Sequence, residues 1–285
     1  MKVKAAAKIN LALDVTGKLP NGYHEIESVF QTVGLYDEIT VELTDGGIEL
    51  TCEPLNSILF NDIIPCNERN IAYKAAQKFL EENNLETGCR IHIKKGIPSQ
   101  AGMGGGSTDA AAVLFCLNKL TGKIFSAPEK LGADVPFFLI GGTAYITGIG
   151  EKISKISDYS DKILVIAKGK EGVSTAEAYA KIDALENHSP VRVKELVNAV
   201  NDNKNIAEYI GNIFESAVNL WEVDDIKQKM LMFGAETACM TGSGSAVFGL
   251  FSDIKSAEKC HIRLTELAYF SHICETVSES FIILE

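Results

Sequence analysis

Apolar side chains alternate with polar or small ones along the first fifteen residues. The apolar positions of this alternation are Val3, Ala5, Ala7, Ile9, Leu11, Leu13 and Val15. Strict period two over this length predicts a β-strand with one buried face. Lys8 and Asn10 then project from the opposite face, about 7 Å apart along the strand. Polar side chains on such a face usually only contact solvent, so the pattern alone assigns them no role.

The periodicity further along predicts a mixed α/β chain. After the first strand, at about residues 2–16, strands are expected near 28–43, 89–94, 142–147 and 162–167. A helix is expected at 70–82, and a glycine loop with its helix at 102–120. A largely helical stretch up to Phe233 and a strand, helix, strand series over 239–277 follow.

The length of the chain favours two domains. A chain of 285 residues exceeds the usual size of one hydrophobic core, and its apolar content of 46% is sufficient for two. The polar run KISKISDYSDK places the boundary near Ile153. The predicted domains are therefore residues 1–153 and residues 154–285.

The segment from Pro98 to Thr108 reads PSQAGMGGGST and continues into the apolar run DAAAVLFCLNKL. Its four glycines, at positions 102, 104, 105 and 106, leave successive backbone N–H groups accessible to an anion. Ser107 and Thr108 stand where a helix is expected to begin, because the apolar residues that follow repeat at helical spacing. A helix N-terminus has unpaired N–H donors and a partial positive charge. The segment therefore predicts a phosphate cradle in a nucleotide-binding protein.

This loop matches neither of the two best-known phosphate loops. A Walker A loop ends in Gly-Lys-Ser/Thr, whereas Gly106 is followed directly by Ser107 and Thr108. The dinucleotide fingerprint has a glycine where Ser107 stands. The alternative is a flexible surface turn that caps an ordinary helix, and three further segments argue against it.

The Asn21-Gly22 pair in LPNGYHE predicts a tight turn. The turn brings Tyr23 and His24 side by side. An aromatic plane next to an imidazole suits a flat heterocyclic ligand. Packing against the protein itself is the alternative.

Asp134 stands alone in the segment LGADVPFFLIGGTA, in which no other residue from Leu131 to Gly150 is charged. Pro136 and the FFLI run predict a buried setting, where a carboxylate needs hydrogen bonds, a cation or a catalytic task. It can also cap a short helix that starts at Pro136, and the two roles are compatible. A second glycine-rich turn, MTGSGSAVFGLF at 240–251, is either a hairpin turn or a second phosphate-binding wall.

Charge and composition exclude several classes of protein. A net charge of −11 argues against a nucleic-acid partner. The N-terminus lacks the continuous apolar region of a signal peptide, and no apolar run approaches the length of a membrane span. The seven cysteines are widely spaced without a CxxC pair, so we expect reduced thiols rather than a metal site or a disulfide framework.

Four segments of the chain resemble the GHMP kinase superfamily in their order and separation. They are AKINLALDVTGKLPNGYHE, PSQAGMGGGSTDAA, LGADVPFFLIGGTA and MTGSGSAVFGLF. The resemblance runs from about Lys4 to Val277. The glycine loop and the last motif are shared across the superfamily, whereas GYHE together with LGADVPFF is specific to the branch that acts on a cytidine diphosphate-linked methylerythritol. The resemblance implies an N-terminal domain like ribosomal protein S5, a ferredoxin-like C-terminal domain and an active site in the cleft between them.

The resemblance implies an ATP-dependent kinase that phosphorylates the 2-hydroxyl of this small molecule, in the non-mevalonate route to isoprenoid precursors. By position, Asp134 is the catalytic carboxylate and Lys8 its cationic partner. Phosphoryl transfer to an alcohol needs an in-line hydroxyl, cations against the moving charge and an acceptor for the proton. Asp134 can take the proton, and a nearby Lys8 would keep it ionised.

The remaining roles are carried over in the same way. Tyr23 is implied to stack on the cytosine, His24 to bond its edge and Tyr179 to form the second aromatic face. The full set of implied substrate contacts is Asn10, Tyr23, His24, Thr175, Tyr179, Gly242 and Gly244. The implied ATP contacts are Asn70, Lys95, Pro98, Ser99, Gln100, Ala101, Gly102, Met103, Gly104, Gly105, Gly106, Ser107 and Thr108.

Mg²⁺ is expected with ATP because it neutralises the triphosphate. No protein ligand is assigned to it, since the hydroxyl of Ser107 at a helix start is more simply a cap. One departure from the family pattern stands between Leu120 and Leu131, where TGKIFSAPEK replaces a longer helix. The shortening either shifts the approach to Asp134 or trims a peripheral helix.

Two other functions stay open at this stage. A GHMP kinase for another small alcohol, such as homoserine or mevalonate, would have no reason to combine Tyr23, His24 and Tyr179. A nucleotide-binding regulator without catalysis would need none of Lys8, Asn10 and Asp134. The expected location is the bacterial cytoplasm, without a membrane partner, and the expected state is a monomer or a homodimer.

Overall fold

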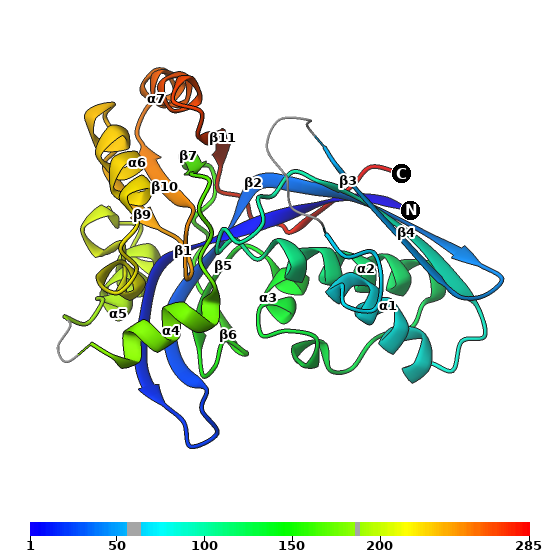
Figure 1. Ribbon diagram of the computed structural model, residues 1–285. Coiled ribbons are helices and arrows are strands. Elements are labelled where there is room, and N and C mark those ends of the chain that lie inside the picture. The colour runs from blue at the N-terminus through cyan, green and yellow to red at the C-terminus, as the bar shows by residue number, and fades with distance from the viewer. Residues whose placement is uncertain (56–63, 186–188) are drawn as a thin grey trace.

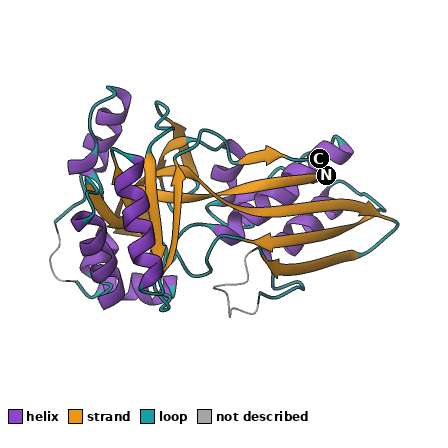
Figure 2. Cartoon of the chain, turned by 90° about the horizontal axis from the view of Figure 1, so that it is seen from above, coloured by secondary structure: helices purple, strands orange, loops and turns teal. Residues whose placement is uncertain are grey.

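The computed structural model describes residues 1–55, 64–185 and 189–285 and contains two β-sheets with helices packed on them (Figure 1). The first sheet has the order β12-β1-β2-β4-β3, with β5 on β2, β6 on β5 and β8 on β1. Its strands are β1 (Lys2–Lys18), β2 (His24–Thr44), β3 (Ile48–Pro54), β4 (Gly88–Lys95), β5 (Thr143–Thr147), β6 (Lys152–Lys155), β8 (Gly211–Asn212) and β12 (Phe281–Ile283). The helices α1 (Ile71–Glu82), α2 (Gly105–Thr121) and α3 (Val135–Ile140) lie on one face of this sheet, as both views show (Figures 1 and 2).

The second sheet has the order β11-β7-β10-β9 and is antiparallel throughout. Its strands are β7 (Ile163–Lys168), β9 (Thr237–Met240), β10 (Val247–Phe251) and β11 (Phe270–Glu275). The helices α6 (Trp221–Met232) and α7 (Ile254–Glu266) pack on it. This βαββαβ order confirms the predicted ferredoxin-like arrangement. The remaining elements are α4 (Thr175–Asp183), α5 (Val193–Asn201) and the 3-10 turns at Pro128–Lys130, Ala207–Tyr209 and Ile213–Ser216.

The first sheet takes strands from both ends of the chain. The strand β12 pairs with the start of β1, and the two-residue β8 pairs with its middle. Both strands lie within the predicted second domain, 154–285, so the sheet does not end where the division was drawn. The division itself stays a prediction.

The prediction of one buried face for the first strand is wrong. From Ala5 to Val15 every residue of β1 is buried, including Lys8 and Asn10 at 4% and 1% exposure. Register shifts between Ala6 and Ala7, and again between Asn10 and Ala12, mark bulges that switch which face a given residue occupies.

Both faces of β1 are covered, which explains this burial. Val3, Ala5 and Leu13 pack with the helix side of the first sheet, whereas Ile9 and Leu11 pack in a second cluster. That second cluster also contains side chains from β7, β10 and α5. The bulges therefore let Ile9 and Leu11 join the two sheets, while Lys8 and Asn10 bond to one another and line a cavity.

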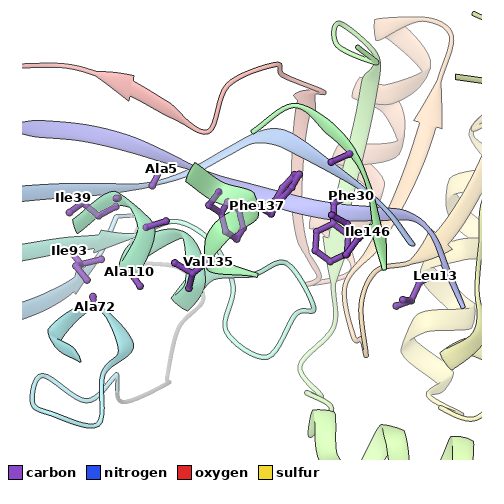
Figure 3. Close-up of a cluster of buried hydrophobic side chains, with 14 of the residues drawn as sticks. Ala5, Leu13, Phe30, Ile39, Ala72, Ile93, Ala110, Val135, Phe137 and Ile146 are labelled. Atoms are coloured by element: carbon purple, nitrogen blue, oxygen red, sulfur yellow. The ribbon is translucent and has the colours of Figure 1, made fainter. Parts of the chain in front are cut away.

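The helix side of the first sheet is a continuous apolar core, shown in Figure 3. Phe137 of α3 meets Phe30 of β2 edge to face, with ring centroids 5.2 Å apart. Ala72 of α1 and Ala110 of α2 are fully buried, and their small side chains let both helices approach the sheet closely. This core fixes α2 and α3, which carry the glycine loop and Asp134.

A buried ion-pair network also ties α2 to the sheet. The ammonium of Lys95, at the end of β4, donates to Asp37 of β2 and to Asp109 of α2, the latter at 2.7 Å. Asp37 also accepts from the backbone N–H groups of Gly96 and Ile97, at 2.6 and 2.9 Å. Burial alone would lower the pKa of Lys95, but the two carboxylates outweigh burial and raise it. Lys95 therefore stays charged and holds the start of the loop to α2.

The glycine loop and the second glycine-rich turn lie backbone against backbone. Gly102 has φ +72°, and a Cβ at Gly242 would lie 2.7 Å from the Gly102 carbonyl oxygen. The N–H groups of Ser245 and Ala246 donate to the carbonyls of Gln100 and Ala101, both at 3.3 Å. The second turn is thus the β9–β10 connection, and it braces the loop from the second sheet.

Replacing Lys95→Met should destabilise the fold by about 3–5 kcal/mol, because it leaves two buried carboxylates without their cation. Burial raises the pKa of Asp109 and Lys95 opposes that rise. The variant would therefore hold Asp109 protonated, and its deficit should shrink as the pH falls. Urea unfolding at two pH values measures both effects. The matched control is Lys204→Met, whose exposed pair with Asp202 should contribute no more than about 1 kcal/mol; equal losses in the two variants would contradict the network.

Gly102→Ala should cost about 2 kcal/mol or more, because alanine is strained at this positive φ and its Cβ meets the Thr241 carbonyl. Gly46→Ala is the control, since a Cβ there meets nothing within 4 Å. The urea midpoint of the control should stay close to that of the unaltered protein. A Gly102→Ala midpoint as high as the control's would show that the two turns do not constrain one another.

Candidate active site

A cavity of about 920 Å³ opens between the first sheet, the glycine loop and the helix α4. This volume suits a ligand of nucleotide size. Most of the residues expected in the site line it, namely Lys8, Asn10, Tyr23, His24, Lys95, Pro98, Ser99, Gln100, Ala101, Gly102, Met103, Gly104, Gly105, Gly106, Asp134, Thr175, Tyr179, Gly242 and Gly244. Asn70, Ser107 and Thr108 are not among the lining residues.

Asn70 serves as the cap of α1. Its side-chain oxygen accepts from the N–H of Ala72 at 2.9 Å, and its amide donates to the Pro65 carbonyl at 2.9 Å. Both polar groups of the side chain are thus used within the protein, and Asn70 is buried. The structure gives Asn70 a capping role and does not bring it into the cavity.

The helix after the glycine loop begins at Gly105, two residues earlier than expected. Gly104 is its N-cap, at φ +71°, and no side chain caps it. The expectation of a cap at Ser107 is therefore wrong, because Ser107 and Thr108 already lie inside the helix. A Cβ at Gly104 would lie 2.7 Å from the ring of Phe138, which explains the glycine there. The first turn of α2 presents only backbone to the cavity, as a phosphate site requires.

Lys8 and Asp134 come together beside this loop. The Lys8 ammonium lies 3.8 Å from the Asp134 carboxylate and donates to the Asn10 side-chain oxygen at 2.7 Å. It also lies over the Phe30 ring, 4.4 Å from the centroid. The Lys8 backbone N–H donates to the carbonyl of Met103 at 3.1 Å, so the strand and the loop are joined at this point.

Burial lowers the pKa of Lys8, and the charge and hydrogen bond of Asp134 oppose that effect. Asn10 is fixed in turn, since its amide donates to the Ser28 hydroxyl at 2.9 Å and its backbone N–H donates to the Thr241 hydroxyl at 2.9 Å. Thr241 belongs to the second glycine-rich turn. Both sheets therefore hold the cation in place.

Asp134 occupies the N-cap position of α3, but its side chain makes no capping hydrogen bond. The expected buried setting is wrong, because the Asp134 side chain is 29% exposed. The helix starts at Val135, one residue before Pro136. The carboxylate is thus free to face both Lys8 and the cavity. The shortened segment before Leu131 leaves this pairing intact.

The helix α4 forms the far wall of the cavity. Thr175, Tyr179 and Asp183 are spaced four residues apart and so share one face of this helix. The rings of His24 and Tyr179 are stacked, 4.5 Å apart at 20°. The expected aromatic face of Tyr179 is thus packed on His24, while Tyr23 is 61% exposed at the rim. Burial and the charge of Asp134 raise the pKa of Tyr179 to about 12, so its phenol stays protonated.

Sequence reasoning missed several lining residues. Lys18 and Asp183 both line the cavity and bond to one another. Asp183 could have been found, because it follows Tyr179 by one helical step on the same face. Phe214, which meets the Tyr179 ring at 87°, lies in a 3-10 turn that no periodicity predicts.

Metal-binding clusters and membrane-spanning helices both bear on the type of site. Among the residues that the structure describes, no three His, Cys, Asp or Glu side chains are placed to hold a metal ion. Within the same residues, every helix is too short or too polar to cross a membrane. The cavity thus combines a backbone phosphate cradle, an ion pair and an aromatic end.

Comparisons with known proteins show the family to which this chain belongs. The family described as GHMP kinases N terminal domain matches residues 70–142, and GHMP kinases C terminal matches residues 182–266. Among solved structures, a crystal structure of 4-(cytidine 5'-diphospho)-2C-methyl-D-erythritol kinase superposes with a TM-score of 0.83 at 29% identity, over 97% of this chain and 99% of the other. A homoserine kinase from Cytophaga hutchinsonii, at 20% identity and a TM-score of 0.75, covers 100% of this chain and 97% of its own and shares the fold.

Curated relatives are closer in sequence. The 4-diphosphocytidyl-2-C-methyl-D-erythritol kinase of Clostridium botulinum (strain Alaska E43 / Type E3) is 41% identical over 93% of this chain and 96% of its own. The enzyme of that name from Clostridium tetani is 40% identical over 97% of this chain and 100% of its own. The chain is therefore an ATP-dependent small-molecule kinase of the GHMP superfamily and belongs to the 4-diphosphocytidyl-2-C-methyl-D-erythritol kinase family.

Proposed function

We propose that this chain transfers the γ-phosphoryl group of ATP to the 2-hydroxyl of 4-diphosphocytidyl-2-C-methyl-D-erythritol, a step in isoprenoid precursor synthesis. The observation that carries this proposal is the pairing of Lys8 and Asp134 beside the glycine loop. The loop offers backbone donors to the triphosphate, and the pair lies where a hydroxyl would meet the γ-phosphate.

Asp134 accepts the proton of the attacking hydroxyl, because it is the carboxylate beside the loop and no capping bond occupies it. Lys8, whose ammonium lies 3.8 Å from the Asp134 carboxylate, adds positive potential at the transferring group. Asn10, held by Ser28 and Thr241, fixes the direction of the ammonium. The acceptor is a crowded tertiary alcohol, so positioning supplies much of the acceleration.

The aromatic end of the cavity receives the cytidyl part of the substrate. Tyr23, His24 and Tyr179 gather there, at the junction of the β1–β2 turn with α4. A pyrimidine ring stacks on exposed aromatic faces, and Tyr23 offers such a face at the rim. Thr175, bonded to Ser243 at 3.1 Å, and the turn at Gly242 and Gly244 line the path between the two ends.

Mg²⁺ would enter with ATP as part of the substrate. The carboxylates that line the cavity are Asp134 and Asp183, and only Asp134 lies beside the loop. One carboxylate plus phosphate oxygens is a usual set of Mg²⁺ ligands, so the residues fit an ion held mainly by the triphosphate. Asp134 is the side chain that would contact it, and the ion would neutralise charge on the phosphates.

A homoserine or mevalonate kinase activity is the main rival, since those enzymes share the fold. The stacked His24 and Tyr179 argue against it, because a short alcohol needs no aromatic wall. A non-catalytic nucleotide-binding role leaves the costly burial of the Lys8 cation beside Asp134 without a purpose. The bacterial cytoplasmic location and the monomeric or homodimeric state stay predictions.

Asp134→Asn should lower kcat by about 10²–10⁴-fold, because the amide cannot accept the hydroxyl proton. The affinity for ATP measured without Mg²⁺ should change less than about twofold, since the glycine loop is untouched. Coupled ADP release and ATP titration measure the two quantities. Asp45→Asn, in the exposed β2–β3 turn, is the matched control. Full turnover in Asp134→Asn would remove this residue from the mechanism.

Cytidine nucleotides should compete with the substrate, and His24→Ala should weaken that competition by about tenfold, because one side of the base-binding end is lost. His92→Ala, on β4 outside the cavity, should leave it unchanged. A panel that includes homoserine and mevalonate in the same ADP assay tests the rival. Turnover that cytidine nucleotides leave unaffected would favour that rival.

A further inference from the structure

Asp183, the last residue of α4, bonds to two side chains of the β1–β2 hairpin. One carboxylate oxygen lies 2.7 Å from the Nε2 atom of His24, and the other accepts from the ammonium of Lys18. All three residues line the cavity. The proposed function makes no use of Asp183 or Lys18.

This arrangement fixes the hydrogen on the imidazole of His24. The bonds from Lys18 and His24 lower the pKa of Asp183, so its carboxyl is ionised at neutral pH. An ionised carboxylate only accepts hydrogen bonds. The Nε2 atom of His24 must therefore donate, and in a neutral imidazole the Nδ1 atom is then an acceptor.

The remaining surroundings of His24 leave this acceptor for a ligand. The side chain is only 9% exposed, and one ring face packs on Tyr179. Among the described residues, Nδ1 has no hydrogen-bond partner, although the ring lines the cavity. Nδ1 is therefore open to a hydrogen-bond donor of a molecule bound in the cavity.

We propose that Asp183 is a positioning residue that selects the base of the substrate. By holding the proton on Nε2, it presents Nδ1 as an acceptor to the 4-amino group of cytosine. The 4-carbonyl of uracil, which is itself an acceptor, is rejected at the same point. This inference rests on the proposed function, because it concerns the cytidyl end of that substrate.

A purely structural role for Asp183 is the alternative. The Lys18–Asp183 pair joins the hairpin to α4, seen side by side in Figure 1, so losing it could loosen the whole base end. Loosening would weaken cytidine and uridine substrates alike. A swap of the two charges separates the roles, because it restores the ion pair while placing a donor, instead of an acceptor, at Nε2.

The first experiment measures the tautomer directly. In ¹⁵N-histidine-labelled protein at about pH 8.5, the five histidines give separate ring signals, and His24→Ala assigns those of His24. We expect the proton on Nε2 in the unaltered protein and on Nδ1 in the double variant Lys18→Asp with Asp183→Lys. A proton on Nδ1 in the unaltered protein, or no change in the swap, would overturn the proposal. The measurement needs no substrate, so it stands even if the proposed function fails.

The second experiment compares cytidine and uridine diphosphate-linked methylerythritol in the ADP assay. Asp183→Ala should raise KM for the cytidine substrate by about tenfold, with kcat within about twofold, and should reduce the preference for cytidine over uridine. The charge swap should reduce that preference by about tenfold or more. Asp202→Ala, which removes a similar surface pair with Lys204, is the control. If the charge swap left the preference for cytidine over uridine unchanged, Asp183 would only stabilise the contact between the hairpin and α4. Failure of the proposed function would give a different result from failure of this inference, because the unaltered protein would then turn over neither the cytidine nor the uridine substrate.

Discussion

The burial of one ammonium group, that of Lys8, is the constraint on which the rest of the site depends. A cation with only 4% of its surface exposed is costly unless its surroundings compensate. Here the compensation comes from Asn10, the ring of Phe30 and the carboxylate of Asp134, contributed by β1, β2 and the start of α3. Each of these partners is held by packing on one or the other sheet. These contacts therefore offset the free-energy cost of burying the Lys8 ammonium. The same contacts hold the ammonium beside the Asp134 carboxylate.

The glycine loop meets a second constraint, which is close approach between backbones. It contacts β1 through Met103, the β9–β10 turn through Gln100 and Ala101, and Phe138 through Gly104. Side chains on the loop would separate these elements. Because the bracing residues come from both sheets, the loop is held in one shape by the whole chain. A preformed cradle of this kind loses little entropy when it takes up a phosphate.

Much of the fold followed from periodicity, because long amphipathic segments and glycine-rich turns are local signals. The strand at 2–16, the helix at 70–82 and the strand, helix, strand series over 239–277 were predictable in this sense, whereas the ferredoxin-like arrangement was expected only from the family resemblance. The inward turn of Lys8 and Asn10 was not, since it depends on bulges in β1 and on a second sheet that covers it. The short edge strand at 281–283 has too few residues for any period. For the site, motifs located Asp134 and the loop, but the packing of His24 on Tyr179 and the bonds of Asp183 arise only from tertiary contact.

The pairing of β12 with β1 limits when the first sheet can be completed during synthesis of the chain. Residues 281–283 complete the edge of a sheet that contains β1, although the two strands are far apart in the sequence, and the Lys2 N–H donates to the Glu285 carbonyl at 2.9 Å (Figure 1). While the chain is still being translated, the outer edge of β1 has backbone groups without that partner strand. That edge can close only after residues 281–283 have been synthesised and have left the ribosome.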